Sequence, residues 1–333
     1  MDGTIPMKTP NTGVLKRIFA ALGDDISRKI YGHRLLFSLL EDKAAIQQMV
    51  HGLFPETEQT DSSKICCYGA GGGGVSFIQS GRKVPFIVDK YKTGDLCGIP
   101  VISLHDFLDL PDHKQYLLIV TVAREDVRCE IERELNQYGL QYILGCPGLQ
   151  YFDLKELNLG NEYFVDAGAL DGNTTKCFLS QVTAGHVYAF EPNPKQFERT
   201  RAALHTYPQV ELLPYGLFDR NDVLRFDPME GNAGSARCSE SGSIQIEVRK
   251  LDDLLGSRKV TFLKMDIEGS ELAALRGAER IIREQRPKLA ICVYHKPEDL
   301  WEIPSLLLSY HPDYKLYLRH YSINETETIL YAI

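Results

Sequence analysis

The chain has 333 residues, of which 44% are hydrophobic and 25% are charged, the proportions of a globular protein rather than of a disordered or fibrous one. Its formal net charge of −8 argues against general binding to nucleic-acid backbones. No apolar run is long enough to span a membrane and the N-terminus lacks the pattern of a secretory signal, so we expect a cytoplasmic protein.

The cysteines are scattered without a CxxC pair, and most stand in apolar segments. They are Cys66, Cys67, Cys97, Cys129, Cys146, Cys177, Cys238 and Cys292. This distribution predicts reduced, packed thiols rather than a disulfide framework, which again suits the cytoplasm.

Residues 1–60 are predicted to form an N-terminal helical extension. Apolar residues recur at helical spacing between residues 13 and 54, and Gly or Asp interrupts the pattern, which predicts two or three amphipathic helices. A polar run over residues 55–64 then leads to the next domain.

Residues 61–150 alternate short apolar strands with helical segments, which is typical of a Rossmann-like domain with a parallel sheet. Its first strand ends in "YGAGGGG", where Gly69, Gly71 and Gly74 match GxGxxG, and Asp89 ends the next strand. This is the dinucleotide-binding pattern, and the backbone NH groups of such a turn suit a phosphate. The alternative is a tight turn without a ligand.

A second series of strands and helices occupies residues 151–333, after a boundary within residues 146–161. Seven strands are expected, including "VELLPYGLF" as one strand, and the short polar "INETE" joins the last two as an antiparallel pair. The predicted fold class is therefore α/β, with two Rossmann-like domains after a helical segment and a seven-stranded C-terminal sheet.

The first turn of this second series, "VDAGALDG", differs in charge from the glycine-rich turn. Two acids here would repel a pyrophosphate and attract a cation, and S-adenosylmethionine carries both an ammonium group and a sulfonium. The glycines allow close approach of a ligand and a tight helix start, and residues 173–175 could cap that helix. We therefore predict a cofactor site that includes Asp166, Ala167, Gly168, Asp171, Gly172 and Asn173.

The ends of the next two strands carry further cofactor candidates. Glu191, in "YAFEPNP", could accept both hydroxyls of a ribose, and Pro192 and Asn193 follow it in the loop. Asp219, in "YGLFDRND", could reach an adenine amino group. The alternative for Asp219 is a solvated turn.

The run "FLKMDIEGSELAALRGAERIIREQRP" is expected to supply the reacting centre. A buried strand ends in Asp266, Glu268 and Gly269, and one helix is predicted to follow it. Lys264 lies in the apolar strand and needs a carboxylate partner, and strand alternation offers Asp266. His295 follows the next strand and could polarise an acceptor hydroxyl. Acids in a first helical turn could instead only stabilise the helix dipole.

These motifs together resemble the FkbM-type S-adenosylmethionine-dependent methyltransferases. The similarity rests on "FVDAGALDG", "AFEPNP", "FLKMDIEGSELAALRGA" and "VYHKPEDLWEIPSLL", and it covers residues 151–333. The N-terminal half resembles the leading domain of two-domain members. One departure is Leu170, where many methyltransferases have a second glycine.

The resemblance implies that Asp166, Gly168 and Glu191 bind cofactor and that Asp266, Glu268 and His295 line the reacting centre, with Lys264 beside them. It also implies methylation of a hydroxyl on a sugar, glycan or natural product. The three residues Asp266, Glu268 and His295 could also hold a metal, but their spacing alone assigns none.

Two other functions remain open from the sequence. An NAD-dependent oxidoreductase acting on a nucleotide-linked sugar would use the glycine-rich turn, but it leaves the acids of the second turn without a role. A nucleotide-sensing scaffold would not need Lys264, Asp266 or His295. The expected partner is a small-molecule or sugar acceptor, not nucleic acid, and the sequence leaves open whether the chain forms a homo-oligomer.

Overall fold

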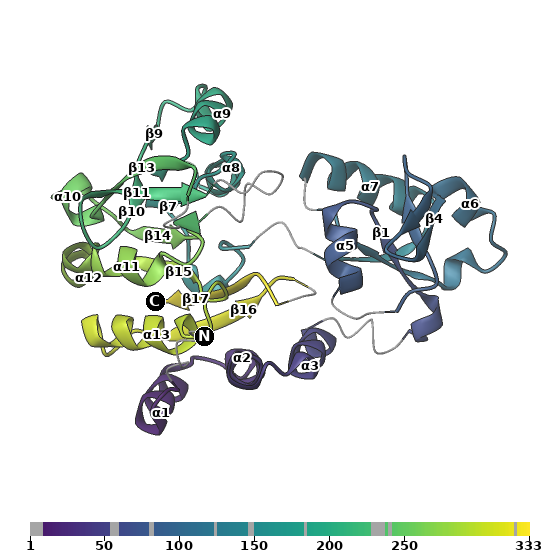
Figure 1. Cartoon of the computed structure of the whole chain (residues 1–333), viewed down its shortest axis with the longest axis horizontal. Helices are drawn as coiled ribbons and strands as arrows, with labels where there is room; N and C mark the ends of the chain where they lie inside the picture. The colour runs from purple at the N-terminus through teal and green to yellow at the C-terminus, as the bar shows by residue number, and fades with distance from the viewer. Residues whose placement is uncertain are drawn as a thin grey trace. The chain divides into compact units, whose positions relative to one another are not determined.

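The computed structural model describes residues 9–53, 60–79, 83–122, 125–145, 150–182, 185–227, 237–238, 242–322 and 325–333. Its contacts divide the chain into two units (Figure 1). One unit contains the N-terminal residues through Leu39, Tyr151–Arg319 and Thr328–Ile333, and the other contains Leu40–Gln150 and His320–Glu327. Among the described residues, no helix has the length and apolar character that crossing a membrane requires.

A seven-stranded sheet forms the centre of the first unit, in the order β16-β17-β15-β14-β7-β8-β9. The strands are β7 (Tyr163–Ala167), β8 (His186–Phe190), β9 (Val210–Leu213), β14 (Phe262–Met265), β15 (Lys288–Cys292), β16 (Leu316–His320) and β17 (Thr328–Ala332). Strands β7, β8, β9, β14 and β15 are parallel, whereas β17 runs antiparallel to β15. The predicted sheet with an antiparallel end is confirmed, although Ile323 and Asn324 of "INETE" lie outside the described residues.

In the part of the chain that the structure describes, six helices follow β7. They are α8 (Asn173–Gln181), α9 (Pro194–Leu204), α10 (Leu251–Leu255), α11 (Glu271–Arg276), α12 (Glu279–Gln285) and α13 (Asp299–Tyr310), and a short 3-10 helix, η3 (Lys155–Leu157), precedes β7. The single helix predicted after Gly269 is wrong, because it is divided into α11 and α12. The Asp252 carboxylate accepts the NH groups of Arg280 and Ile281 and so starts α12 separately.

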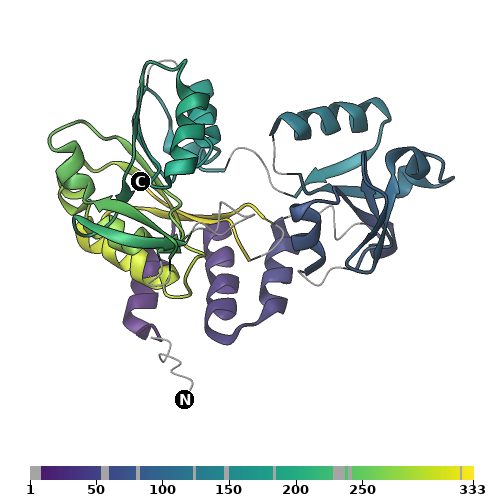
Figure 2. The same ribbon diagram turned by 45° about the horizontal axis from the view of Figure 1, so that its top comes forward.

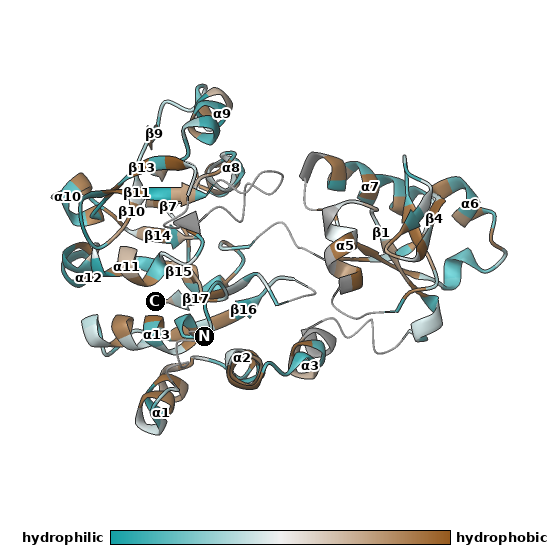
Figure 3. Ribbon diagram, viewed as in Figure 1, coloured by the Kyte–Doolittle hydropathy of each residue, from teal (hydrophilic) through white to brown (hydrophobic). Residues whose placement is uncertain are grey.

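The core of this unit lies around β7 and β14. All four residues of β14 are buried, and Phe164 stacks on Phe178 with ring centroids 4.3 Å apart. Phe152 contacts both rings and also Phe262. Figure 3 shows hydrophobic colour on the strands and hydrophilic colour on outer helices such as α12. Such a buried sheet, with apolar residues on both faces, is what parallel strands covered by helices require.

A separate four-stranded sheet interrupts the chain between β9 and β14. It has the order β10-β13-β11-β12, with β10 (Gly216–Leu217), β11 (Asp222–Asp227), β12 (Arg237–Cys238) and β13 (Ile244–Arg249). The prediction of "VELLPYGLF" as one strand is therefore wrong. Its first half is β9, and after Pro214 and Tyr215 its second half pairs with β13.

Helices α1 (Thr12–Ala21) and α2 (Asp25–Leu40) pack on the unit formed by the C-terminal half (Figures 1 and 2). Leu22 forms a bridge with Leu316 of β16, and the buried Ser27 hydroxyl accepts the Leu318 NH at 2.9 Å. Asp24 forms an ion pair with Arg319 at 2.6 Å. These contacts complete one edge of the seven-stranded sheet with residues from the other end of the chain.

The second unit contains a six-stranded sheet in the order β3-β4-β2-β1-β5-β6. Its elements are α3 (Lys43–Leu53), η1 (Ser62–Lys64), β1 (Ile65–Tyr68), α5 (Gly72–Gln79), β2 (Ile87–Asp89), β3 (Gly94–Leu96), β4 (Ile99–Ser103), α6 (Leu104–Leu108), η2 (His113–Gln115), β5 (Leu117–Val120), α7 (Glu125–Gln137) and β6 (Gln141–Leu144). All neighbouring strands are parallel except β3, which pairs antiparallel with β4. The predicted Rossmann-like parallel sheet is thus present, with one additional edge strand.

Six of the described cysteines are free, and three of these six are buried. Cys66, Cys67 and Cys292 are buried, but Cys97 and Cys129 are exposed. The expectation of packed thiols therefore fails at Cys97 and Cys129, which lie at a turn and on a helix surface. Cys146 lies outside the described residues, and the burial of Cys238 is not described.

Candidate active site

The turn after β7 passes directly against the end of β14. Gly168 has φ +84°, and a Cβ at this position would overlap the carbonyl oxygen of Asp266. Gly172, with φ +79°, is the N-cap of α8 and makes no side-chain cap. Residues 173–175 therefore do not cap the helix, and the Asp171 carboxylate instead accepts the Asn173 NH at 3.0 Å. Gly168 is thus required by a tertiary contact as well as by any ligand.

Asp166 and Lys264 form a buried ion pair. The Lys264 Nζ donates to Asp166 Oδ1 at 3.0 Å and to the carbonyl oxygens of Ala167 and Gly168, and Thr175 donates its hydroxyl to Asp166 Oδ2. Burial opposes the charge, but Asp166 and Asp266 outweigh it and raise the pKa of Lys264. The predicted pairing of Lys264 with Asp266 is wrong, because the parallel register sets Lys264 opposite Asp166 on the adjacent strand.

This pairing changes the electrostatics of the turn. Asp166 is fully buried and neutralised by Lys264, so its carboxylate cannot by itself attract a cationic ligand. Asp171 remains exposed, and Glu191 directly follows the adjacent strand β8. The negative charge available to a ligand here therefore comes from these two acids rather than from Asp166.

Glu191 holds the turn and retains acceptor capacity. Its Oε1 accepts the Asn193 NH at 2.9 Å and its Oε2 accepts the Leu170 NH at 3.0 Å. Each carboxylate oxygen can accept one more hydrogen bond. Burial raises the pKa of Glu191 to about 7, although both backbone hydrogen bonds and Lys264 act in the opposite direction.

Asp266 follows β14 and is held by two tyrosines. Tyr151 donates to its Oδ2 at 2.8 Å, and Tyr294 donates to its Oδ1 at 3.4 Å. Burial alone would raise the pKa of Asp266, but Lys264, His295 and the Tyr151 hydroxyl lower it. Asp266 is therefore ionised at neutral pH.

His295, just after β15, lies among three carboxylates. Its Nδ1 is 2.9 Å from Oε1 of the fully buried Glu271, and its Nε2 is 3.5 Å from both Asp266 Oδ1 and Glu268 Oε2. Burial lowers the pKa of His295, but these acids outweigh it and raise the pKa to about 9. Glu268 has a positive φ of 54°, an uncommon conformation outside glycine that is often found at functional sites.

Comparison with known proteins matches this part of the chain to one family. Residues 166–322 match the model of the methyltransferase FkbM domain. These residues form an FkbM methyltransferase domain. The match confirms the predicted resemblance of this part of the chain to FkbM methyltransferase domains.

Two relatives of the FkbM domain are named methyltransferases. The 2-O-methyltransferase NoeI of Sinorhizobium fredii is 24% identical over 37% of this chain, and the hexuronic acid methyltransferase AglP of Haloferax volcanii is 32% identical over 43%. The chain spans 59% of the length of each relative.

A solved structure has the same fold over nearly the whole chain. It is a crystal structure of methyltransferase FkbM from Methylobacillus flagellatus, with 20% sequence identity and a TM-score of 0.52 over 93% of this chain and 99% of that one. The likeness includes the region before the FkbM domain, so the predicted two-part α/β fold is confirmed.

Most of the predicted site residues of the FkbM domain meet at one edge of its sheet. Gly168 touches Asp266, and His295 faces Asp266 and Glu268. Asn193 caps α9 by accepting the Lys195 NH, and Pro192 stands beside it. Asp219 follows β10 in the four-stranded sheet and pairs with Arg220 at 3.2 Å, so it does not end a strand of the main sheet. Its predicted adenine contact has no support from this position.

Three residues of the site were missed from the sequence. Tyr151 precedes the FkbM domain, Tyr294 adjoins His295, and Glu271 begins α11. The sequence carried a signal for Glu271, because it belongs to the "EGSE" run and stands four residues after Ile267. In the structure its carboxylate accepts the Ile267 NH at 2.8 Å. Tyr151 carried no such signal, since only the folded chain brings it to Asp266.

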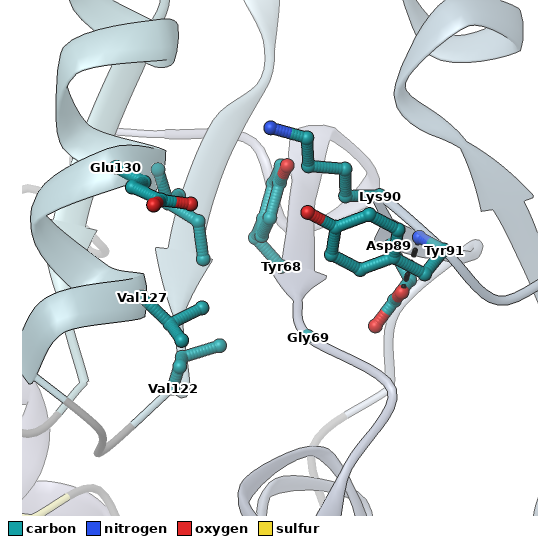
Figure 4. A pocket seen from close by; sticks show the side chains of 9 residues that line it. Tyr68, Gly69, Asp89, Lys90, Tyr91, Val122, Val127 and Glu130 are labelled. Carbon is teal, nitrogen blue, oxygen red and sulfur yellow. Dashed lines mark hydrogen bonds between the residues drawn. The ribbon is translucent and has the colours of Figure 1, made fainter.

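The glycine-rich turn lies in the other unit and is built in a similar way. The Asp89 carboxylate accepts the NH groups of Ala70, Tyr91 and Lys92 at 2.7 to 2.9 Å. A Cβ at Gly74 would overlap the Gly69 carbonyl oxygen, whereas nothing lies within 4 Å of one at Gly71. A cavity of about 70 Å³ beside this turn is lined by Tyr68, Gly69, Asp89, Lys90, Tyr91, Val122, Val127, Glu130 and Ile131 (Figure 4). A nucleotide or phosphate ligand at this turn stays a prediction.

Proposed function

We propose that the chain transfers a methyl group from S-adenosylmethionine to a hydroxyl group of a sugar or glycan. The observation that carries this proposal is the contact between the Gly168 turn and Asp266, with His295 beside it. Through this contact, a cofactor held at the turn would lie next to a carboxylate and an imidazole. Those are the groups that activation of a hydroxyl requires.

The residues present fit this cofactor. Glu191 has one unused acceptor position on each oxygen, which suits the two hydroxyls of a ribose. The turn contributes backbone groups close to Gly168, and Asp171 contributes an exposed carboxylate for an ammonium group. When bound, S-adenosylmethionine supplies an electrophilic methyl group on a sulfonium that leaves as a neutral thioether.

Asp266 is the better candidate for the base. Its carboxylate is ionised because Lys264 and the Tyr151 hydroxyl stabilise the charge and lower its pKa. His295, with a pKa raised to about 9, is protonated at neutral pH and cannot take a further proton. In this arrangement Asp266 accepts the proton of the acceptor hydroxyl, and the His295 imidazolium balances the negative charge of the neighbouring acids.

The acceptor class is supported by the relatives of the FkbM domain. AglP is described as a hexuronic acid methyltransferase and NoeI as a 2-O-methyltransferase. A polar acceptor also suits a site lined by Asp266, Glu268 and His295, because its hydroxyls can replace water as hydrogen-bond donors to the carboxylates.

Transfer of a labelled methyl group to a panel of hexuronic acids, neutral hexoses and oligosaccharides tests this function. We expect label in at least one sugar, and base-stable label would identify an ether rather than an ester. Asp266→Asn should lower kcat by about 10²-fold or more while the affinity for S-adenosylhomocysteine stays within a few fold. Absence of S-adenosylhomocysteine binding in calorimetry would contradict the proposal, as would unchanged kcat in the variant.

A further inference from the structure

Three side chains at the reacting centre converge on one small volume. Asp266 follows β14, Glu268 stands two residues further on, and His295 follows β15. One ligand atom from each of the three lies within 4.8 Å of the other two. The carboxyl ends of two adjacent parallel strands therefore supply two carboxylates and one imidazole to the same point.

The His295 imidazole is buried, and its Nε2 atom has no hydrogen-bond partner among the described residues. The His295 side chain is 8% exposed, and Nε2 points between Asp266 and Glu268 at 3.5 Å from each. These distances exceed those of ordinary N–H···O hydrogen bonds. Two ligand atoms that bind the same cation at about 2.1 Å lie about 3 to 3.5 Å apart, so the observed separations leave room for an ion.

The surrounding residues hold two of these three side chains, His295 and Asp266, as an outer shell holds metal ligands. Glu271 Oε1 lies 2.9 Å from Nδ1 of His295, so the other ring nitrogen faces the two carboxylates. Tyr151 binds Asp266 Oδ2, which directs Oδ1 toward His295. A carboxylate behind the imidazole and a hydrogen bond behind the ligating carboxylate are the usual supports of a metal ligand set.

We propose that Asp266, Glu268 and His295 bind one divalent cation, which replaces the proton on Nε2 of His295 and releases that proton to solvent. Two carboxylates and one imidazole suit Mn²⁺ or Mg²⁺ better than a soft-metal site, which would need thiolates. Three protein ligands leave coordination positions open for oxygen atoms of an acceptor. If the proposed function holds, the cation would bind an acceptor hydroxyl and make it more acidic. Asp266 would then act as a ligand instead of as the base, the hydroxyl proton would pass to water, and the oxygen would take the methyl group from the sulfonium.

Binding of Mn²⁺ to the chelator-treated full chain, without cofactor or acceptor, tests the site directly. Electron paramagnetic resonance counts free Mn²⁺, and we expect saturation at one ion per chain. Spin-echo modulation of the bound ion should show coupling to one imidazole nitrogen. In His295→Ala we expect the nitrogen coupling to disappear and the affinity to fall at least about tenfold.

Two further variants separate ligation from general effects on the fold. Tyr151→Phe removes the hydrogen bond behind Asp266 and should weaken Mn²⁺ binding about tenfold while the nitrogen coupling remains. His205→Ala is the matched control, because His205 is exposed at the end of α9 and its ring nitrogen Nδ1 lies 2.7 Å from the Ala202 carbonyl oxygen of that helix. It should leave both readouts unchanged, and thermal unfolding checks that each variant is folded.

The results of these experiments separate failure of the metal site from failure of the proposed function. Absence of saturable Mn²⁺ binding, or nitrogen coupling that persists in His295→Ala, overturns the metal site and leaves the cluster as an ion-pair network. Methyl transfer that survives chelation with full kcat would also overturn it, while the proposed function stands. Specific Mn²⁺ binding without methyl transfer to any sugar supports the metal site and counts against the proposed function.

Discussion

Glu191 and Asp266 are two acids at the same edge of one sheet whose pKa values move in opposite directions. Burial dominates at Glu191 and raises its pKa to about 7. At Asp266 the opposing charge of Lys264 and the neighbouring His295 overcomes burial and lowers the pKa. Environment rather than residue type therefore decides which acid is ionised near neutral pH.

The raised pKa of Glu191 predicts a pH-dependent affinity for the cofactor. Below about pH 7 the group is protonated, and above it the carboxylate accepts ribose hydroxyls more strongly, so S-adenosylhomocysteine should bind several-fold more tightly at pH 8 than at pH 6. The same shift stabilises the fold below the unfolded pKa of about 4.5, and this contribution is lost as pH rises through about 7.

Calorimetry at the two pH values measures the affinity. Glu191→Gln should remove the difference, whereas Glu198→Gln, an exposed acid paired with Arg201, should retain it. If the affinity for S-adenosylhomocysteine depended equally on pH in Glu191→Gln and in the unchanged protein, Glu191 would not be the group responsible.

The buried pair of Lys264 and Asp166 predicts a large effect on stability. Lys264→Met leaves Asp166 charged and buried without its partner, which should cost about 3–5 kcal/mol of unfolding free energy. The double variant Lys264→Met/Asp166→Asn should cost less than the sum of the single changes, because neither charge is left alone.

Urea unfolding followed by circular dichroism gives these values. Lys315→Met, at an exposed position, should change stability by no more than about 0.5 kcal/mol. Strict additivity of the two changes in the pair would show that Lys264 and Asp166 do not stabilise one another.

At the scale of elements, the two turns share one construction despite their different sequences. In each, an acid at the end of the second strand accepts an NH group from the turn after the first strand: Asp89 from Ala70, and Glu191 from Leu170. The acid therefore fixes the turn whether or not a ligand is present. Glycine count is accordingly a poor guide to which turn performs chemistry.

The glycines of the first turn have unequal roles, which predicts unequal effects of alanine. A Cβ at Gly73 would overlap the Thr121 carbonyl oxygen, so Gly73→Ala should destabilise this unit by about 1–3 kcal/mol. Gly71→Ala adds a methyl group to open space and should be tolerated within about 0.5 kcal/mol. Thermal unfolding of both variants provides the comparison, and equal losses would contradict the packing argument.

At the scale of the whole molecule, the first helices stabilise the FkbM domain although they are far from it in sequence. Ser27 of α2 accepts the Leu318 NH and also a hydrogen bond from Arg319, and it is fully buried. Ser27→Ala leaves the buried Leu318 NH without an acceptor and should lower the unfolding free energy by about 1–3 kcal/mol.

Thermal unfolding with and without S-adenosylhomocysteine measures this effect. The midpoint of Ser27→Ala should fall while the ligand still raises it, because Ser27 lies in α2, outside the proposed cofactor site. Ser309→Ala, at an exposed hydroxyl on α13, should leave the midpoint unchanged. An unchanged midpoint for Ser27→Ala would show that α2 contributes little to this domain.

The sequence alone determined the features that depend on local patterns. Apolar periodicity predicted the two α/β sheets, and the motifs around Gly168, Glu191, Asp266 and His295 identified the edge where most of the site forms. Such signals are readable because strand alternation, turn chemistry and the carboxyl ends of parallel strands are set by neighbours in the chain.

Only the tertiary structure decided which side chains of the site contact one another. Cross-strand register paired Lys264 with Asp166 rather than Asp266, and folding brought Tyr151 to Asp266. It also placed Asp219 after β10 of a separate sheet. These contacts join residues distant along the chain, and their energies depend on burial and on the geometry of several elements at once, which no local pattern encodes.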